Sequence, residues 1–401
     1  MRPSIEQAFN DLFTWCREFN FAGHDPFDAL NSRVFAATPF QHSRGARLIW
    51  TQAFKRFPLN LRNLALVPRQ QNSKGLALFS LAALSNSRRL KTIEAQIESR
   101  DLLEQLSEAR IRNAAGAAWG YNFDWQSRNF FAPAGTPMIV PTAFAARAFS
   151  EAYQTLGDEI YLRIARSSCD FILKDLRRTV GTSSEVCFSY SPNDDTQIFN
   201  ASLLAAETLA SVSQLSGETE FCELARRAVN YVVRQQRDDG SWAYGSGPAQ
   251  QWSDSFHTAY VLSSLWRIRE ACAENDRQLE GALRRGYGFW RERFFLADGW
   301  PKYYHDSLYP ADAHAAATAI ITLIELRELD TDALPLAEAI ANWTIRNLRD
   351  ARGFFYYQRR RFYRIRTPYM RWTQAWMLYA LGRLLEAQGS LSLWERVRER
   401  G

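Results

Sequence analysis

One pattern recurs five times along the chain: an aromatic loop, then a polar residue, then a helix of small apolar residues. The polar residues, called anchors below, are Thr142, Asn200, His257, His314 and Thr373. Successive anchors are 57 to 59 residues apart. So regular a period predicts one helical hairpin per repeat. Because each repeat places its anchor at the same point, we expect the anchors to converge at one end of the array.

The segments between anchors predict a second ring of helices. Each contains a helix whose apolar residues recur at intervals of three and four, as over 159–177, 219–236, 277–294 and 334–349. The anchor helices are apolar nearly all round and should be buried. A sixth inner helix is expected from Gly75, an outer helix over 88–110 and another over 4–19. We therefore expect an all-α (α/α)6 toroid, a single domain over 1–386, although five repeats also fit an open solenoid.

Composition restricts location. No apolar stretch approaches the ~18 residues of a membrane span, and the N-terminus lacks a signal-peptide core. The five cysteines are scattered, without a CxxC pair, which predicts buried free thiols in a reducing compartment. We expect a cytoplasmic protein. Residues 387–401 lie outside the repeat pattern and are expected to form a disordered tail.

The connections that lead into the inner helices are long. They cover 111–141, 178–199, 237–256, 295–313 and 351–372. Long loops grouped on one face usually carry function. The N-termini of the inner helices would point their partial positive charge toward this face, the mouth, which favours an anionic group there.

Carboxylates precede two of the anchors. Asp254 lies three residues before His257, and Asp312 two residues before His314. Two carboxylates facing each other across the mouth would suit glycoside hydrolysis. A histidine beside a carboxylate would instead abstract a proton next to a uronate carboxyl group, in a lyase or epimerase. The alternative role of the aspartates is helix capping. The spacing matches no standard metal site, and we expect no cofactor.

Aromatic and basic residues occupy the same loops. Flat aromatic rings stack on the C–H faces of sugars, and arginine can clamp a carboxylate or phosphate. The basic charge is confined to one loop, 356–371, which argues against a nucleic-acid groove and also fits a solvated β-hairpin. The predicted substrate-binding residues are Trp119, Tyr121, Asp124, Asp195, Asn200, Tyr244, Trp300, Tyr304, Tyr357, Arg366, Arg371, Trp372 and Gln374.

Residues 227–242 match the QW motif of the squalene-cyclase superfamily, through Arg227-Ala228, Tyr231-Val232, Gln236, Gly240 and Trp242. In that superfamily the glutamine and tryptophan are structural, so the match supports a toroid. The acidic motif of those cyclases is interrupted here by Pro192. An isoprenoid-binding toroid stays an alternative, and it would need a deep apolar central cavity.

The chain also resembles the exopolysaccharide-biosynthesis toroid proteins of bacterial polysaccharide gene clusters. The resemblance spans about 4–386 and rests on GHDPFDALNS from Gly23 and on RWTQAW from Arg371. Phe27 and Ala29 depart from the expected Tyr and Gly. The resemblance implies a role in making or modifying a polysaccharide or its precursor, with association with the synthesis machinery, and it transfers no catalytic residues. Asp25 and Asp28 would fold over the mouth or, as we favour, brace the first hairpin.

These observations lead us to expect a carbohydrate-active enzyme of hydrolase, lyase or epimerase type. Its ligand would be an oligosaccharide or polysaccharide, held in the mouth by aromatic residues and arginines. The arginines would suit a ligand that carries an anionic group. The predicted catalytic residues are Asp254, Asp312, His257 and His314. A non-catalytic glycan-binding or scaffold protein of a polysaccharide-synthesis complex is the first alternative; it would tolerate loss of each carboxylate.

Overall fold

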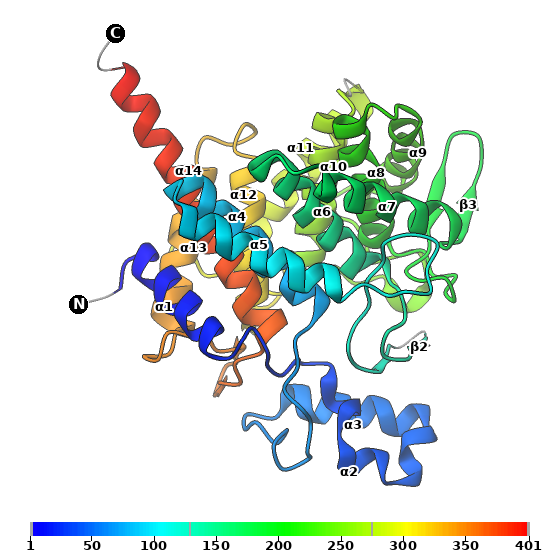
Figure 1. Cartoon of the computed structure of the whole chain (residues 1–401), viewed down its shortest axis with the longest axis vertical. Helices are drawn as coiled ribbons and strands as arrows, with labels where there is room; N and C mark the ends of the chain where they lie inside the picture. Colours follow the sequence, from blue (N-terminus) through cyan, green and yellow to red (C-terminus); the bar gives the residue numbers. More distant parts are fainter. Residues whose placement is uncertain (1–2, 128–129, 274–275, 399–401) are drawn as a thin grey trace.

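The computed structural model describes residues 3–127, 130–273 and 276–398. In this part of the chain twelve helices form two concentric rings (Figure 1). The inner helices are α4 (Ser73–Leu90), α6 (Ile139–Leu156), α8 (Phe199–Ser216), α10 (Ser255–Ala271), α12 (Ala313–Glu325) and α14 (Trp376–Arg398). The outer helices are α1 (Ile5–Glu18), α5 (Ile93–Glu108), α7 (Glu159–Lys174), α9 (Glu220–Arg234), α11 (Arg277–Phe294) and α13 (Ala333–Leu348).

The inner ring is closed. Each inner helix packs against the next in chain order, and α14 packs against α4. Each outer helix after α1 packs mainly against the inner helix that precedes it in the chain, and α1 packs against α14. This arrangement confirms the (α/α)6 toroid and rules out the open solenoid.

Local chemistry explains the alternation of buried and amphipathic helices. The inner α8 buries nearly every side chain from Phe199 to Ala210, whereas the outer α9 buries one stripe and exposes charged residues. The turns from α6 to α7 and from α8 to α9 are short because a glycine ends each of the two inner helices. Gly157 and Gly217 adopt φ of 73° and 80°, a conformation that other residues reach only with strain.

The QW motif is structural, as predicted. Gln236 donates to the backbone oxygens of Gly240 (3.0 Å) and Ala282 (2.9 Å). Trp242 is buried, and its indole N–H donates to Val232 O at 2.9 Å. The pair therefore closes one repeat onto the next.

The long connections gather at one end of the toroid and contain short strands. These are β1 (Trp125–Gln126), β2 (Phe131–Ala132), β3 (Arg178–Gly181), β4 (Val186–Phe188), β5 (Ala311–Asp312), β6 (Gln358–Arg359) and β7 (Arg364–Ile365). They pair as β1–β2, β3–β4 and β5–β6–β7, all antiparallel. The arginine-rich loop therefore contains the β-hairpin that its sequence allowed. Two short helices complete this end, η3 (Pro248–Gln250) and η4 (Met370–Ala375).

Residues 23–70, called the mouth segment below, form a small helical unit that projects from this end of the toroid (Figure 1). It contains η1 (Asp28–Asn31), α2 (Arg33–Ala36), η2 (Pro39–His42) and α3 (Arg44–Arg56). It has its own small core of Ala29, Phe54, Ala65 and Val67. The sequence predicted no helices here, because the segment carries no copy of the repeat.

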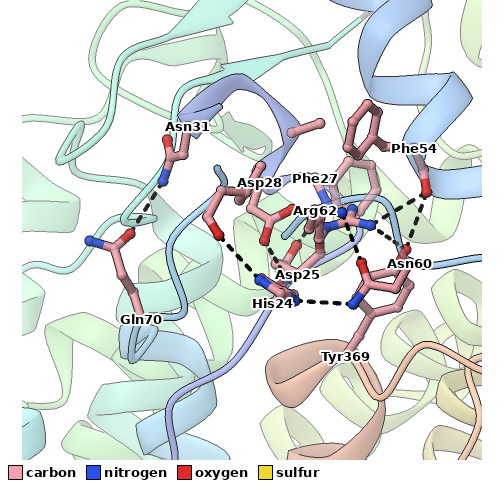
Figure 2. A network of polar contacts seen from close by, with 12 residues as sticks. His24, Asp25, Phe27, Asp28, Asn31, Phe54, Asn60, Arg62, Gln70 and Tyr369 are labelled. Carbon is pink, nitrogen blue, oxygen red and sulfur yellow. Dashed lines mark hydrogen bonds and ion pairs between the residues drawn. The ribbon is translucent and has the colours of Figure 1, made fainter. Parts of the chain in front are cut away.

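A buried polar network attaches the mouth segment to the toroid (Figure 2). Arg62 donates to the Asp28 carboxylate at 2.6 Å, to Asp25 O at 2.8 Å and to the Tyr369 hydroxyl at 2.9 Å. The Asp25 carboxylate accepts two hydrogen bonds from Arg371, at 2.6 and 2.8 Å. Burial raises the pKa of Asp28 to about 6 even beside Arg62. The two aspartates therefore hold the mouth segment together and attach it to Arg371, rather than to the first hairpin as we expected.

The cysteines differ from the prediction. Cys222 in α9 and Cys272 at the end of α10 form a disulfide, with their Cα atoms 5.6 Å apart, while Cys16, Cys169 and Cys187 are free and buried. The pairing is a consequence of helix packing across 50 residues of sequence, so it left no local signal. Disulfides are typical of oxidising compartments, so the cysteines no longer support a cytoplasmic location, which stays a prediction.

Two other observations concern the ends and surfaces of helices. The α14 backbone continues to Arg398, so helix covers most of the tail that we expected to be disordered beyond residue 386. Among the described helices, none is both long and apolar enough to cross a membrane.

Candidate active site

A cavity of about 550 Å³ opens at the mouth, between the N-terminal ends of the inner helices and the mouth segment. Its size is typical of small-molecule sites, which span about 300–1,000 Å³. Aromatic rings form much of its wall, and both anchor histidines line it. Three of the five anchors, Asn200, His257 and His314, therefore converge as expected. Thr142 instead bonds to the backbone of Trp119.

His257 is held by the aspartate that caps its helix. The Asp254 carboxylate accepts from the His257 backbone N–H at 2.8 Å and lies 2.9 Å from Nδ1 of the same residue. Asp254 is fully buried. The carboxylate therefore keeps the proton on Nδ1 and leaves Nε2 as the basic nitrogen. The imidazole contacts the rings of Tyr244 and Phe256 and faces the cavity.

His314 lies in an apolar part of the same cavity. Its ring contacts Phe256, Trp372 and Trp376, with centroids 4.3 to 4.8 Å apart. Burial, with nearby cationic side chains, lowers its pKa far below the usual value, so the imidazole is neutral. Its Nε2 lies 2.9 Å from the Tyr260 hydroxyl, and its buried Nδ1 has no hydrogen-bond partner.

Tyr260 connects His314 to a buried lysine. Burial raises the pKa of the Tyr260 phenol well above its usual value, so the hydroxyl keeps its proton. Lys74 Nζ lies 3.3 Å from this hydroxyl and 4.5 Å from the centre of the Phe144 ring. Burial lowers the pKa of Lys74 far below that of a free lysine. The three side chains form a chain of hydrogen-bonding groups along one side of the cavity.

Asp312 caps its helix and lies behind the cavity wall. Its carboxylate accepts from the backbone N–H groups of His314 (2.8 Å) and Ala315 (3.2 Å) and from the Gln358 amide (2.5 Å). It is fully buried, and burial raises its pKa to about 6. Neither Asp312 nor Asp254 lines the cavity. The expected pair of carboxylates facing each other across the mouth is therefore absent, because both side chains turn back to cap helices.

The predicted substrate-binding residues separate into two groups. Several line the cavity: Tyr121, Asn200, Tyr244, Tyr304, Arg371 and Trp372. The buried Asn200 Oδ1 has no hydrogen-bond partner and is available to a ligand. Tyr244 stacks on Trp252, with centroids 4.5 Å apart. The other residues lie outside the cavity: Trp119, Asp124, Asp195, Trp300, Tyr357, Arg366 and Gln374.

The second group has structural roles. Trp119 donates to Leu106 O at 2.8 Å, and Trp300 donates to Leu308 O at 3.0 Å. Asp124 accepts from the Ala134 backbone, exposed Asp195 pairs with Arg177, and Gln374 bonds to both backbone groups of Phe355. Tyr357 packs on Tyr369. Trp119 and Trp300, each the first aromatic residue of its loop, thus close repeats, while the later residues Tyr121 and Tyr304 of these loops reach the cavity.

The two arginines also differ from the expectation. Arg366 is exposed and lies outside the cavity. Arg371 is buried and lines it, but the Asp25 carboxylate already occupies its guanidinium group. The sequence did not reveal this partner, because Asp25 and Arg371 are 346 residues apart.

The cavity residues that sequence reasoning missed include Lys55, Lys74, Trp252 and Tyr260. Tyr260 could have been found, since it follows His257 by one helical turn and so shares its face. Lys74 directly precedes Gly75 at the start of the first inner helix, where the other repeats have their anchors. Lys55 belongs to the mouth segment, and nothing in its local sequence distinguishes it from other surface lysines.

No protein-family model matches the sequence, and no curated protein matches it either. Solved structures do match. A sugar epimerase from a ruminal bacterium is similar with a TM-score of 0.61 and 14% identity, over 80% of this chain and 88% of that one. A GH76 α-mannanase of Bacteroides thetaiotaomicron has a TM-score of 0.61 at 13% identity, over 79% and 87%.

An unsaturated glucuronyl hydrolase specific for heparin has a TM-score of 0.57 at 14% identity, over 79% of this chain and 86% of that one. At these identities the likeness is one of fold. It shows the (α/α)6 toroid fold.

Proposed function

We propose that the protein is a sugar-converting enzyme that moves a proton on its substrate, as an epimerase or isomerase does, with His257 and His314 as the proton-transferring groups. The observation that carries this proposal is the pair of histidines in one cavity, each oriented by a different partner, while the two candidate carboxylates cap helices and do not line that cavity. A sugar epimerase is among the structures with this fold.

His257 is suited to take the proton. Asp254 fixes its Nδ1–H and stabilises the imidazolium that forms when Nε2 accepts a proton. A carbon next to a carbonyl or carboxyl group of the sugar, placed against Nε2, would lose its proton to this nitrogen. The substrate then becomes an enolate, whose negative charge needs a donor.

His314 and Tyr260 are suited to the opposite role. The neutral imidazole and the protonated phenol are hydrogen-bonded to each other, so the pair has one proton left to donate. That proton can polarise the sugar oxygen or return to the carbon. The two histidine rings both contact Phe256, and both residues line the same cavity. Epimerisation results when the proton returns to the opposite face, and isomerisation when it returns to the neighbouring carbon.

Two alternatives are less well supported. A glycoside hydrolase needs carboxylates beside the scissile bond, and no described Asp or Glu lines this cavity. An isoprenoid would leave the unpaired polar atoms of Asn200 and His314 unsatisfied. The resemblance to the exopolysaccharide-biosynthesis proteins supports a sugar of a bacterial polysaccharide or its precursor as the substrate. A non-catalytic scaffold remains the competing function within that setting.

Incubation of the protein with reducing sugars, sugar acids and oligosaccharides in heavy water tests the proposal. Mass spectrometry and NMR should detect one deuterium on a carbon next to the carbonyl or carboxyl group, without cleavage. A fragment that gains water would indicate a hydrolase, and an unsaturated fragment a lyase. Glycan binding with no exchange would favour the scaffold.

A further inference from the structure

The charged side chains that line the mouth cavity are cations. Lys55, Arg56, Lys74 and Arg371 reach it alongside the two histidines, whereas none of the lining residues described is an Asp or Glu. Asp25 neutralises Arg371, and Arg56 is exposed to solvent. Lys55 and Lys74 form no ion pair with a described residue. Lys74 is buried and Lys55 is half-buried. Because cations removed from water are normally paired, their lack of an acidic partner needs an explanation.

The lysines differ in their surroundings. Lys55 extends from α3 of the mouth segment, with Nζ 4.3 Å from the centre of the Phe27 ring and 5.6 Å from that of Trp372. Lys74 lies among the rings of Phe144, Tyr260 and Trp376. Burial lowers the pKa of Lys74 far below its usual value, while that of Lys55 falls to about 8. At neutral pH Lys55 is therefore the lysine that carries a positive charge.

Lys55 also lies close to the proposed chemistry. The Trp372 ring that it approaches is in edge contact with His314, at 4.3 Å between centroids. A group bound at Lys55 would thus belong to the same small molecule as an atom bound at His314. The other charges around Lys55 are Asp312 and Asp25, which favour its protonated form, and Arg56 and Arg360, which oppose it.

We propose that the ligand of this cavity is an acidic sugar, and that the Lys55 ammonium group binds its carboxylate or phosphate. In this proposal the mouth segment contributes to substrate selection, because its helix α3 places the Lys55 cation at the cavity. The proposal rests on the proposed function only for the sugar part of the ligand. The competing explanation is that Lys55 merely covers the Phe27 and Trp372 rings with its alkyl chain.

Isothermal titration calorimetry with glucuronate, glucose 6-phosphate and glucose separates the two explanations. We expect at least one acidic sugar to bind more tightly than glucose at pH 7, and which of them does so identifies the anionic group. Lys55→Met should weaken binding of that sugar by about 10- to 100-fold, the usual effect of losing a charged hydrogen bond, and leave glucose unaffected. Arg33→Met is the matched control, because it removes the same charge from an exposed site on the mouth segment.

The pH dependence adds a second readout. The anion binds the protonated amine, so affinity is full below the pKa of about 8 and falls about tenfold for each pH unit above it. Lys55→Arg should retain binding at pH 7 and remove this fall up to pH 9. Acidic sugars that bind no better than glucose, or equal losses in Lys55→Met and Arg33→Met, would overturn the proposal. Lys55-dependent binding without deuterium exchange would refute the proposed reaction alone.

Discussion

The two ends of the toroid differ in whether their charged side chains have partners of opposite charge. At the mouth, the lining cations lack acidic neighbours on the cavity wall. At the far end, where the inner helices finish, arginines and glutamates alternate around the axis. Arg147 of α6 pairs with Glu207 of α8, and Arg267 of α10 pairs with both Glu207 and Glu325 of α12.

The ring of ion pairs continues through the remaining inner helices. Arg88 of α4 binds Glu386 at 2.6 Å and Glu151 at 3.2 Å, and Arg383 lies 3.7 Å from Glu386. A second hollow of about 510 Å³ lies beside these residues, and four arginines of its wall, Arg88, Arg147, Arg267 and Arg383, have glutamate partners within the protein. Matched charges hold the six helices together at this end, whereas at the mouth Lys55 has no ion-pair partner among the described residues. Loss of a mouth residue should therefore affect chemistry, and loss of a far-end residue should affect stability.

The largest effect is expected at the mouth. His257→Gln removes the proposed base, and the rate of deuterium exchange into the substrate should fall about 10²- to 10⁴-fold, the usual contribution of a general base. The melting temperature should change little. His305→Gln is the control, because His305 is exposed and lies outside the cavity. Equal rates in the two variants would remove His257 from the reaction.

The far end should show the converse. Glu207 is buried and accepts from Arg147 and from the Ser264 hydroxyl. Glu207→Ala should lower the free energy of unfolding by about 3–5 kcal/mol, because it leaves a buried guanidinium without its partner. Urea denaturation measures this change. Deuterium exchange at the mouth should remain at the wild-type rate under conditions where the variant is folded. Glu223→Ala, at an exposed pair, should change stability by less than about 0.5 kcal/mol.

A smaller effect should appear in the pH dependence of stability. The folded pKa of Asp312 is about 6, above its unfolded value of 3.8. Its contribution to stability is therefore present below pH 3.8 and is lost as the pH rises through 6. The difference of about two pKa units corresponds to about 2–3 kcal/mol. Asp312→Asn keeps the helix cap but not the titration, so its stability should fall less between pH 4.5 and 7.5. Identical pH profiles would show that Asp312 is not perturbed in this way.

The fold was predictable because the sequence patterns that specify it are local and recur in each repeat. The period between anchors and the contrast between all-apolar and amphipathic helices each depend on neighbouring residues, and closure of the ring follows once six hairpins are recognised. The mouth segment was not predictable in the same way. Its helices occur once, and its attachment depends on Arg62 and Asp25, whose partners include Tyr369 and Arg371 at the other end of the chain.

The candidate site was predictable in part. The anchors His257, His314 and Asn200 reach the cavity from the starts of inner helices, whereas the anchor Thr142 bonds to the backbone of Trp119. The orientations of the aspartates were not predictable, since a residue before a helix can cap it or face the mouth, and only packing decides which.

By itself, the sequence determined the helical hairpins, their number and the end at which the anchors meet, because hydrophobic periodicity acts through adjacent turns. Only the tertiary structure decided that Asp254 and Asp312 cap the helices that carry the histidines, that Asp25 pairs with Arg371, and that Lys55 lines the cavity. Those outcomes depend on burial and on partners distant in sequence, and both exist only in the folded chain.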